Sequence, residues 1–462
     1  MGELLAGVGR SDITPAPGTP QGGWGAQTHQ RGLGADLPFY ATALVLKDSG
    51  QVVAIIDVDA IGFDEKWTCR ILEAVVEISK IPRERVRFSC THTHSGPNTF
   101  RLKTISEGLE MALGYLSTLP ERIAGAVWQA QQCLQPVRCA SGAGRCEINV
   151  NRRLKLPSGR IVVGNNWEGP ADPTVRVIRF DNPDGKPAAI ILHYACHPTT
   201  IAWQNQYFTP DYPGIARRTV EEQIGCPCIF LQGAAGNVTP RRGFTGNLET
   251  YRRAGRLLGL EASKVALGIE TLPHRQSLKG VIESGAPIAL YNEEPLNACN
   301  PDFRVVSRMI QLPLKTFLPP DQLETEAEVL RQDLARLRRE GNEKEISLAT
   351  ARATQAGMRA ERARMYYGKS HMDWQLQGIR VSSVALLSIP GEPFTEINEQ
   401  IVGASPFSET LFSGYSNGGF GYIPIASAYE DGGYEVETSP FAPQAAEIVV
   451  RESAEVLHKL WE

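Results

Sequence analysis

Short apolar runs alternate along the chain with longer stretches in which apolar side chains recur every three or four residues. Runs at 42–47 and 52–60 flank Asp48-Ser-Gly50, which has a turn composition, and they predict two paired strands. An amphipathic stretch at 64–80 predicts a helix, and the apolar run at 86–91 predicts the next strand. The same pattern predicts helices over 121–134, 212–224 and 247–268 and strands over 188–195, 227–232 and 383–389. This alternation predicts an α/β fold with a mixed, largely parallel sheet flanked by helices.

A charged segment after Pro319-Pro320 departs from this alternation. Apolar side chains recur there at helical spacing, as Leu323, Ala327, Leu330, Leu334 and Leu337. Gly341-Asn342 ends this helix, and a second helix is expected to run from 343 to about 367. The spacing therefore predicts a charged helical hairpin over 321–367, inserted in the fold. Its interpretation stays open between a lid, a contact between copies in a homo-oligomer, and a surface hairpin without a direct part in catalysis.

Composition and charge narrow the class of protein. The 462 residues are 42% hydrophobic and 21% charged, which are ordinary values for a soluble globular chain. A net charge of −4 with dispersed Lys and Arg gives no basis for nucleic-acid binding, so a small or neutral ligand is expected. No signal peptide is visible, and no apolar run approaches the roughly 20 residues of a membrane span. Nine cysteines form no dense framework and favour a reducing compartment, so the expected location is cytoplasmic.

The segment Thr91-His92-Thr93-His94-Ser95 carries the first candidate chemistry. It follows the buried strand expected at 86–91, and residues i and i+2 of a strand point to the same face. His92 and His94 are therefore aimed into one site at the end of that strand. Two interpretations remain at this point: a pair that binds a metal or a substrate carbonyl, and a pair hydrogen-bonded at a strand end for structural reasons.

Other polar turns also follow predicted strands. His197 closes the strand expected at 188–195, the turn at 233–240 contains Asn237 and Thr239, and Glu392 follows the strand expected at 383–389. Any one of these residues has a common structural explanation. Because ligands of open α/β sheets bind outside the carboxyl ends of the strands, we expect the turns to share one crevice.

Two histidines and a carboxylate are a typical ligand set of hydrolytic zinc sites, because nitrogen and oxygen donors suit zinc and leave room for a water. Zinc lowers the pKa of that water to about 7 and polarises a carbonyl group. The set therefore predicts an amide or ester hydrolase. Backbone N–H groups of the glycine-rich turn at 233–236 are candidates to hold the substrate oxygen.

Motifs spread over nearly the whole chain resemble one known family. The most specific is Thr91-His-Thr-His-Ser-Gly-Pro97. The others, in order, are Val8-Gly-Arg-Ser-Asp12, Gly22-Gly-Trp-Gly, Asn149-Val-Asn-Arg152, His197-Pro, Gly236-Asn-Val-Thr-Pro240, Pro390-Gly-Glu392, Ser416-Asn417, Tyr422, Tyr429 and Tyr434-Glu435. Together they resemble the catalytic domain of the neutral/alkaline, non-lysosomal ceramidases.

The resemblance implies a role for each matched site residue. The zinc ligands implied by motif position are His92, His197, Glu392 and Tyr422. The resemblance implies that His94 contacts the scissile group or orients the water. It also places Arg152 and Tyr434 near the amide and its hydroxyl substituents.

The chain also departs from the family pattern. Asn237 and Thr239, which we include among the candidate catalytic residues, stand where the ceramidases have Asp and Ser. Phe441 stands where the family has a second tyrosine. We expect residues 1–462 to form a single ceramidase-like catalytic domain without a C-terminal immunoglobulin-like domain. The metal chemistry is expected to be retained and the substrate pocket to be changed.

The resulting prediction is a zinc-dependent hydrolase that cleaves a carbon–nitrogen amide bond with a zinc-activated water. The substrate is expected to be an N-acyl compound, ceramide-like or smaller. The alternatives are a zinc-dependent ester or lactone hydrolase and a non-catalytic ligand-binding protein of the same fold. Asp57 and Asp59 share one face of a strand, which leaves open either a second metal or capping by backbone groups or arginine side chains.

Overall fold

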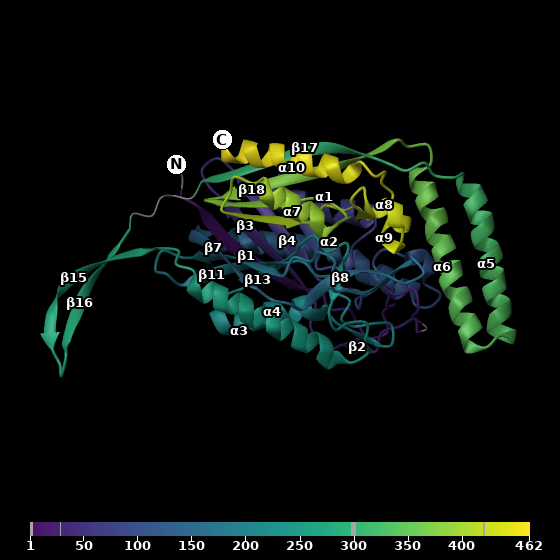
Figure 1. Ribbon diagram of the computed structural model, residues 1–462, viewed down its shortest axis with the longest axis horizontal. Coiled ribbons are helices and arrows are strands. Elements are labelled where there is room, and N and C mark those ends of the chain that lie inside the picture. Colours follow the sequence, from purple (N-terminus) through teal and green to yellow (C-terminus); the bar gives the residue numbers. More distant parts are fainter. Residues whose placement is uncertain (1–2, 28, 297–301, 419–420) are drawn as a thin grey trace.

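The computed structural model describes residues 3–27, 29–296, 302–418 and 421–462. Its body is built from three sheets of four or five strands with helices on their outer faces (Figure 1). Residues from all three sheets, among them Leu44, Ile191 and Leu386, share one buried apolar cluster. The sheets therefore pack against one another at the centre, and the helices cover their other faces.

The first sheet has the strand order β5-β4-β3-β1-β6 and carries helices α1 and α2. Its elements are β1 (Leu5–Asp12), β3 (Tyr40–Lys47), β4 (Val52–Val58), β5 (Val86–Cys90), β6 (Gln135–Pro136), α1 (Glu65–Ser79) and α2 (Leu109–Gln132). Asp64 caps α1 by accepting a hydrogen bond from the Trp67 N–H, and Lys80 ends it in a left-handed conformation. The prediction placed the start of α2 after Pro120, but the helix continues through this proline, with Leu116 and Ile123 in the core on either side.

The second sheet has the order β13-β11-β10-β7 and is covered by α3 and α4. Its elements are β7 (Arg138–Arg145), β10 (Thr174–Asp181), β11 (Pro187–Tyr194), β13 (Cys228–Gln232), α3 (Asp211–Ile224) and α4 (Leu248–Gly268). The third sheet has the order β17-β18-β19-β21 and is covered by α7 and α10. Its elements are β17 (Phe303–Pro313), β18 (His371–Val381), β19 (Val384–Ser388), β21 (Glu409–Ser413), α7 (Thr395–Gly403) and α10 (Ala445–Trp461).

The prediction of a largely parallel sheet is wrong. Each of the three sheets contains a single parallel pair among the described strands, namely β4–β5, β11–β13 and β19–β21, and the other pairs are antiparallel. In every case a helix joins the parallel strands, as α1, α3 and α7 do. The apolar and helical periodicity reports these strand–helix–strand units, but it carries no information on the antiparallel strands that complete each sheet.

The parallel edge strands of the three sheets meet one another. Ser89 at the end of β5 bridges to Ser416, and Gly233 after β13 bridges to Ser413 of β21. Buried Arg87 reinforces this meeting, since it donates hydrogen bonds to the hydroxyls of Ser388 and Ser413, at 2.5 and 2.6 Å. The carboxyl ends of three βαβ units, which the sequence analysis identified as separate polar turns, therefore open onto one region.

Short elements frame this region. They are β2 (Gly34–Ala35), β8 (Asn149–Lys155), β9 (Ile161–Asn166), β12 (Tyr207–Phe208), β14 (Val238–Pro240), β20 (Glu392–Pro393), β22 (Tyr422–Ile423), α8 (Ala428–Asp431), α9 (Tyr434–Thr438) and the 3₁₀ turns Arg83–Arg85 and Leu102–Thr104. The parallel pair β20–β22 aligns Glu392 with Tyr422. These two residues are distant in sequence, and this pairing places their side chains in one part of the molecule.

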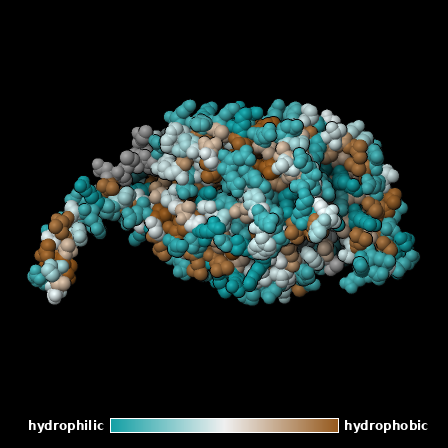
Figure 2. All heavy atoms as spheres, in the orientation of Figure 1, coloured by the Kyte–Doolittle hydropathy of each residue, from teal (hydrophilic) through white to brown (hydrophobic). Residues whose placement is uncertain are grey.

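Two hairpins project from opposite ends of the body (Figure 1). At one end α5 (Pro320–Glu340) and α6 (Glu343–Tyr366) pack through Leu323, Ala327 and an alanine face of α6. Asn342 and Glu345 form a capping box at the start of α6. At the other end β15 (His274–Glu283) and β16 (Pro287–Pro295) form an exposed two-stranded sheet with apolar side chains on its surface (Figure 2). Among the described residues, none of the helices has the length and apolarity that a membrane span requires.

Candidate metal centre and active site

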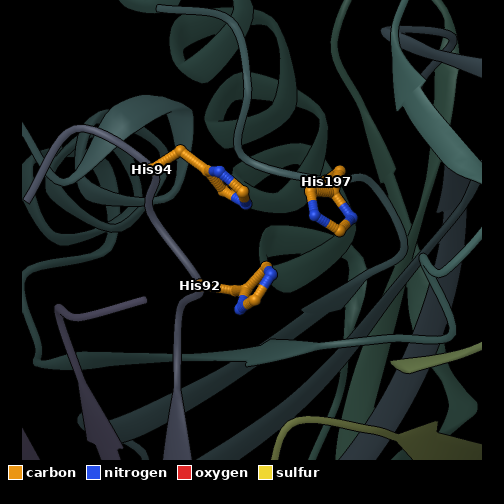
Figure 3. A group of neighbouring side chains, drawn as sticks. All are labelled: His92, His94 and His197. Atoms are coloured by element: carbon orange, nitrogen blue, oxygen red, sulfur yellow. The ribbon is translucent and has the colours of Figure 1, made fainter. Parts of the chain in front are cut away.

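Three histidines lie where the βαβ units meet. His92 and His94 follow β5, and His197 follows β11 (Figure 3). One nitrogen from each ring lies within 4.8 Å of those of the other two, and the ring centroids are 4.7 to 5.1 Å apart. The structure thus brings together the histidine pair and the third histidine that the sequence analysis singled out.

Backbone carbonyl groups orient all three rings in the same way. The Nδ1 atoms of His92, His94 and His197 lie 2.6, 3.1 and 3.1 Å from the carbonyl oxygens of Ile61, Gly23 and Ala235. A carbonyl oxygen only accepts hydrogen bonds, so each Nδ1 carries the proton and each Nε2 keeps a free lone pair. This is the orientation that a metal-binding histidine requires.

For two of the three rings this lone pair has no hydrogen-bond donor within the described chain. The buried Nε2 atoms of His94 and His197 lack a partner, as does Oε2 of Glu392. Oε2 of Glu392 lies 3.6 Å from Nε2 of His92 and 3.7 Å from Nε2 of His197. Ligands placed about 2.0–2.2 Å from a tetrahedral metal ion are roughly 3.3–3.6 Å apart, so a divalent cation fits between these donors. Buried acceptors without donors are costly, and a cation would remove that cost.

Burial keeps the histidines neutral. It lowers the pKa of His92 and His197 well below the usual value and that of His94 to about 3, and the nearby positive charge of Arg152 contributes in the same direction. Burial raises the pKa of Glu392 to about 7, although Arg152 opposes this shift. Neutral imidazoles are the form that binds a metal, and binding would draw Glu392 into its ionised form.

Tyr422 stands beside these donors. Its ring stacks on that of His197 at 6.5 Å, and the Arg152 guanidinium lies 5.2 Å from its ring centre. Burial and the charge of Glu392 raise the pKa of the Tyr422 hydroxyl well above its usual value. Without a cation this phenol therefore keeps its proton, so its assignment as a ligand depends on the metal stabilising the phenolate.

Arg152 and Tyr434 line the same region. Nε of Arg152, on β8, donates to Glu435 of α9 at 2.7 Å, while its buried Nη2 lacks a partner in the described chain. Glu435 also accepts a hydrogen bond from Arg153 at 3.1 Å, so one carboxylate balances two guanidinium groups. Tyr434 is 38% exposed and its ring lies 5.8 Å from that of Tyr422. Arg152 is thus positioned to direct one free donor into the site.

Asn237 and Thr239 contact other parts of the fold. The Asn237 side chain donates to Glu396 at 2.8 Å and accepts from the Thr395 N–H at 2.9 Å, at the first turn of α7. The fully buried hydroxyl of Thr239 hydrogen-bonds that of Thr199 at 3.2 Å. These bonds tie the turn after β13 to its neighbours, whereas a catalytic role of the two side chains stays a prediction.

Sequence reasoning did not single out Tyr415. Its buried ring lies 4.5 Å from His92, and its hydroxyl has no hydrogen-bond partner among the described residues. Tyr415 and His92 both have a positive φ, of 57° and 69°, a strained conformation for residues other than glycine. The position of Tyr415 just after β21 was the available signal, because polar turns at the other strand ends also supply the site.

Among the described residues, Asp57 and Asp59 belong to no cluster of three or more metal-binding side chains of the kind that the histidines form. Arg217 of α3 donates to Asp57 at 2.8 Å and to Asp59 at 2.5 Å. Asp59 also accepts from the Tyr40 N–H at 2.9 Å. The buried guanidinium thus compensates the two carboxylates, which is the capping interpretation left open by the sequence.

A buried cluster of imidazoles beside a carboxylate, where the carboxyl ends of βαβ units meet, defines an α/β protein with a candidate metal centre. Residues 4–242 match the family model described as neutral/alkaline non-lysosomal ceramidase, N-terminal, and the chain belongs to this family. The resemblance found in the sequence motifs is therefore confirmed.

Individual relatives match more distantly. The chain is 27% identical over 252 residues to the neutral ceramidase of Pseudomonas aeruginosa, a match covering 51% of this chain and 36% of the relative. It is 26% identical over 259 residues to neutral ceramidase B of Dictyostelium discoideum, covering 51% and 35%. The match thus spans about a third of the length of these relatives.

The crystal structure of neutral ceramidase from Pseudomonas aeruginosa has a similar fold. It superimposes with a TM-score of 0.69 at 19% identity, covering all of this chain and 75% of that structure. A second structure, titled ceramidase complexed with C2, gives a TM-score of 0.67 at 19% identity, with coverage of 100% and 76%. At this level of identity the likeness establishes the mixed α/β fold alone.

Proposed function

We propose that the protein is a zinc-dependent hydrolase that cleaves the carbon–nitrogen amide bond of an N-acyl compound. The observation that carries the proposal is the convergence of free imidazole lone pairs with Oε2 of Glu392 in a buried site. Membership of the ceramidase family supports an amide as the bond that is cut. Ceramide is one candidate substrate, and a smaller N-acyl compound is another.

The proposed zinc ligands are His92, His197, Glu392 and Tyr422, all of which border the same space. When bound, zinc would polarise the amide carbonyl and lower the pKa of water. Carbonyl groups of Ile61 and Ala235 hold the His92 and His197 rings in the ligating tautomer. The fold therefore prepares the donors before any ligand arrives, which favours a fixed metal position.

Residues beside the proposed ligands would act on the substrate. The free Nη2 of Arg152 is a charged donor in a buried site, suited to stabilise the negative charge that develops on the carbonyl oxygen. Neutral His94 offers a lone pair on Nε2 that can orient the attacking water. Tyr434 would contribute a hydroxyl at the more exposed side of the site.

Metal content and turnover test the proposal together. Purified protein supplemented with zinc should hold about one zinc per chain by elemental analysis, and His92→Ala and Glu392→Ala should lose it. The zinc-loaded protein should release fatty acid from a fluorescent short-chain ceramide, lose this activity with a chelator and regain it with zinc. Protein without bound zinc after supplementation would contradict the proposal, and activity indifferent to chelation would point instead to Thr239 or another nucleophile.

Matched substrates separate the alternatives. An ester and an amide with the same acyl chain should both be tested, because the same donors could serve ester or lactone hydrolysis. We expect the amide to be cut. Zinc-loaded protein that cuts only the ester would favour the esterase alternative, and protein that binds zinc but cuts neither would favour a non-catalytic ligand-binding role.

A further inference from the structure

Helix α6 forms a border of the candidate active site. A Cβ added to Gly25 would lie 3.8 Å from Cγ2 of Thr354 on α6, so the backbone of Gly25 passes close to this helix. Gly25 is two residues after Gly23, whose carbonyl orients His94. Toward the other end of the helix, the ring of Tyr366 packs on Phe317 at 5.6 Å. The segment that leads into α5 is tied to the α9 region, since Lys315 donates to the carbonyl of Val436. Helix α6 therefore extends from the loop beside His94 toward the region of Tyr434, with α5 on its outer side (Figure 1).

Arg362 lies on the stretch of α6 between these two contacts. It is eight residues after Thr354 and four before Tyr366, and helical periodicity places it on the same broad side as both. The opposite side carries Ala356 and Ala360, which pack on α5. Arg362 is partly buried and thus projects from α6 toward the body of the protein.

Arg362 differs from neighbouring arginines in lacking a carboxylate. Arg359 pairs with Glu326 at 2.6 Å, and Arg364 pairs with Glu324. Among the described residues, no ion pair connects Arg362 to an acidic group within 4.0 Å. A partly buried guanidinium without a counter-ion is unfavourable, whereas the exposed arginines beside it are compensated.

Within the part of the chain that the structure describes, Arg101 is a second arginine without a carboxylate partner, and its loop lies on the side of the site that α6 borders. It lies in the loop that follows His94, and Asn98 holds its backbone by accepting from its N–H at 3.0 Å and donating to its carbonyl at 3.3 Å. Its guanidinium lies 4.8 Å from the ring centre of Phe100, and the described chain contains no ion pair to it. Burial is the main cause that lowers the pKa of Arg362, and Tyr434 opposes this shift. The positive charge of Arg101 lowers the pKa of Arg362 further. The charge of Arg101 also lowers the pKa of His94 and that of Glu392, so Arg101 lies within electrostatic range of the site as well as of Arg362.

The two acids of the site itself have other partners. Glu435 balances both Arg152 and Arg153, and Glu392 faces the histidines. Neither carboxylate is paired with Arg101 or Arg362, so a bound anion would compensate these two charges. Guanidinium groups are well suited to carboxylates because their paired N–H donors match the two oxygens.

We propose that Arg101 and Arg362 form a clamp for a carboxylate on the substrate, so that the preferred substrates are anionic N-acyl compounds. This inference rests on the proposed amide hydrolysis and specifies its substrate class. The clamp gives the α5–α6 hairpin a function in substrate selection. The carboxylate can belong to the amine part of the substrate, as in an N-acyl amino acid, or to its acyl part, as in a monoamide of a dicarboxylic acid.

Matched pairs of substrates test the clamp. N-lauroylglycine and N-lauroylethanolamine differ at the end of the amine part, where a carboxylate replaces a hydroxymethyl group. N-dodecylsuccinamic acid and N-dodecylbutanamide differ at the end of the acyl part, where a carboxylate replaces a methyl group. We expect kcat/KM of the wild-type protein to favour the anionic member of one pair by at least about tenfold, the effect of one charge-assisted contact. The pair that shows the preference identifies the part of the substrate that carries the carboxylate.

Substitutions on α6 assign the preference to Arg362. Arg362→Gln should reduce the anionic-to-neutral ratio of kcat/KM by about tenfold, and Arg362→Lys should retain part of it, because it keeps the charge without the paired donors. Arg359→Gln is the matched control, since this arginine is exposed, ion-paired and one turn away, and it should keep the wild-type ratio. Equal ratios in wild-type protein and Arg362→Gln, with both proteins folded by circular dichroism, would overturn the clamp.

Binding measurements keep this test separate from the proposed activity. If the zinc-loaded protein cuts none of the four amides, hydrolysis is rejected and calorimetric titration with the same compounds decides the clamp. Tighter binding of an anionic member by wild-type protein, lost in Arg362→Gln, would support it. Equal affinity for the anionic and neutral members of both pairs would overturn it.

Discussion

Two buried polar clusters lie close together in this protein and differ in how their charges are satisfied. Asp57 and Asp59, at the end of β4, share the guanidinium of Arg217, although one oxygen of each carboxylate has no further partner. In the histidine cluster, Nε2 of His94, Nε2 of His197 and Oε2 of Glu392 have no hydrogen-bond donor in the described chain. Both clusters lie at or just beyond the ends of parallel strands, so position in the fold does not distinguish them.

This difference indicates which kind of buried polar cluster is a candidate ligand site. The aspartates form a closed ion cluster that ties α3 to the first sheet, because a cation from the chain itself compensates them. The unpartnered atoms of the histidine cluster converge on one space, where a cation from outside would compensate them. An account of the hydrogen-bond partners therefore separates a structural cluster from a candidate metal centre.

The largest expected effect follows from removing a donor from the histidine cluster. His197→Ala should lose bound zinc and reduce kcat/KM by at least about 10³-fold, or about 4 kcal/mol of transition-state stabilisation. Elemental analysis and amide hydrolysis check both results. Exposed His371→Ala is the control and should keep zinc and activity. Stoichiometric zinc in His197→Ala would break the comparison, because it would show that the cluster is not the metal centre.

Removing the cation from the aspartate cluster should affect stability rather than metal content. Arg217→Met leaves two buried carboxylates uncompensated and should lower the free energy of unfolding by about 3–5 kcal/mol. Urea denaturation at pH 7 measures this loss. Combining it with Asp57→Asn and Asp59→Asn should recover part of the stability. Two zinc ions per wild-type chain, one of them lost in the Asp57→Asn and Asp59→Asn variant, would contradict the structural role of these acids.

His193 sharpens the comparison because it is a buried histidine outside the cluster. Its Nε2 lies 2.9 Å from the Phe412 carbonyl, and its Nδ1 has no partner in the described chain. His193 thus has one free nitrogen, but it is not part of the cluster of histidines that could share a metal. Burial, aided by Arg176, lowers its pKa to about 4. A lowered folded-state pKa stabilises the fold above the unfolded value of about 6.5, and this stability is lost as pH falls toward 4.

The His193 contribution should be visible in the acid dependence of stability. Each pH unit between about 6.5 and 4 should cost roughly 1.4 kcal/mol through this residue, because the unfolded state binds one more proton. His193→Gln keeps a donor for Phe412 and removes the titration, so its free energy of unfolding should fall less steeply with acid. Urea denaturation at pH 7, 6 and 5 gives the slopes. Identical slopes for the two proteins would show that the pKa of His193 is not lowered.

The smallest expected effect concerns Asn237, where the family has Asp. Asn237→Asp removes the donor to Glu396 and places a fully buried carboxylate against the partly buried one of Glu396, so it should destabilise the fold by about 1–2 kcal/mol. Combining it with Glu396→Gln restores a donor–acceptor pair and should recover most of the loss. Thermal denaturation of the single and double variants measures the coupling. Full stability of Asn237→Asp would argue against a structural role for this amide.

Local patterns in the sequence predicted a substantial part of the fold and the site. The units β4–α1–β5, β11–α3–β13 and the two helices of the α5–α6 hairpin lie close to their expected bounds, since periodicity and caps are local properties. His92, His94 and His197 were placed correctly at strand ends because a strand's alternation and its end are readable nearby.

Contacts between distant residues decided the rest. The antiparallel strands, the meeting of β5 with Ser416 and the alignment of Glu392 with Tyr422 depend on pairing across the chain, which periodicity does not encode. The same holds for Tyr415 beside His92 and for the lack of a counter-ion at Arg362. The sequence alone determined which residues could bind a metal. Only the tertiary structure decided which buried groups find a partner within the protein and which do not, because burial and pairing arise when separate sheets pack together.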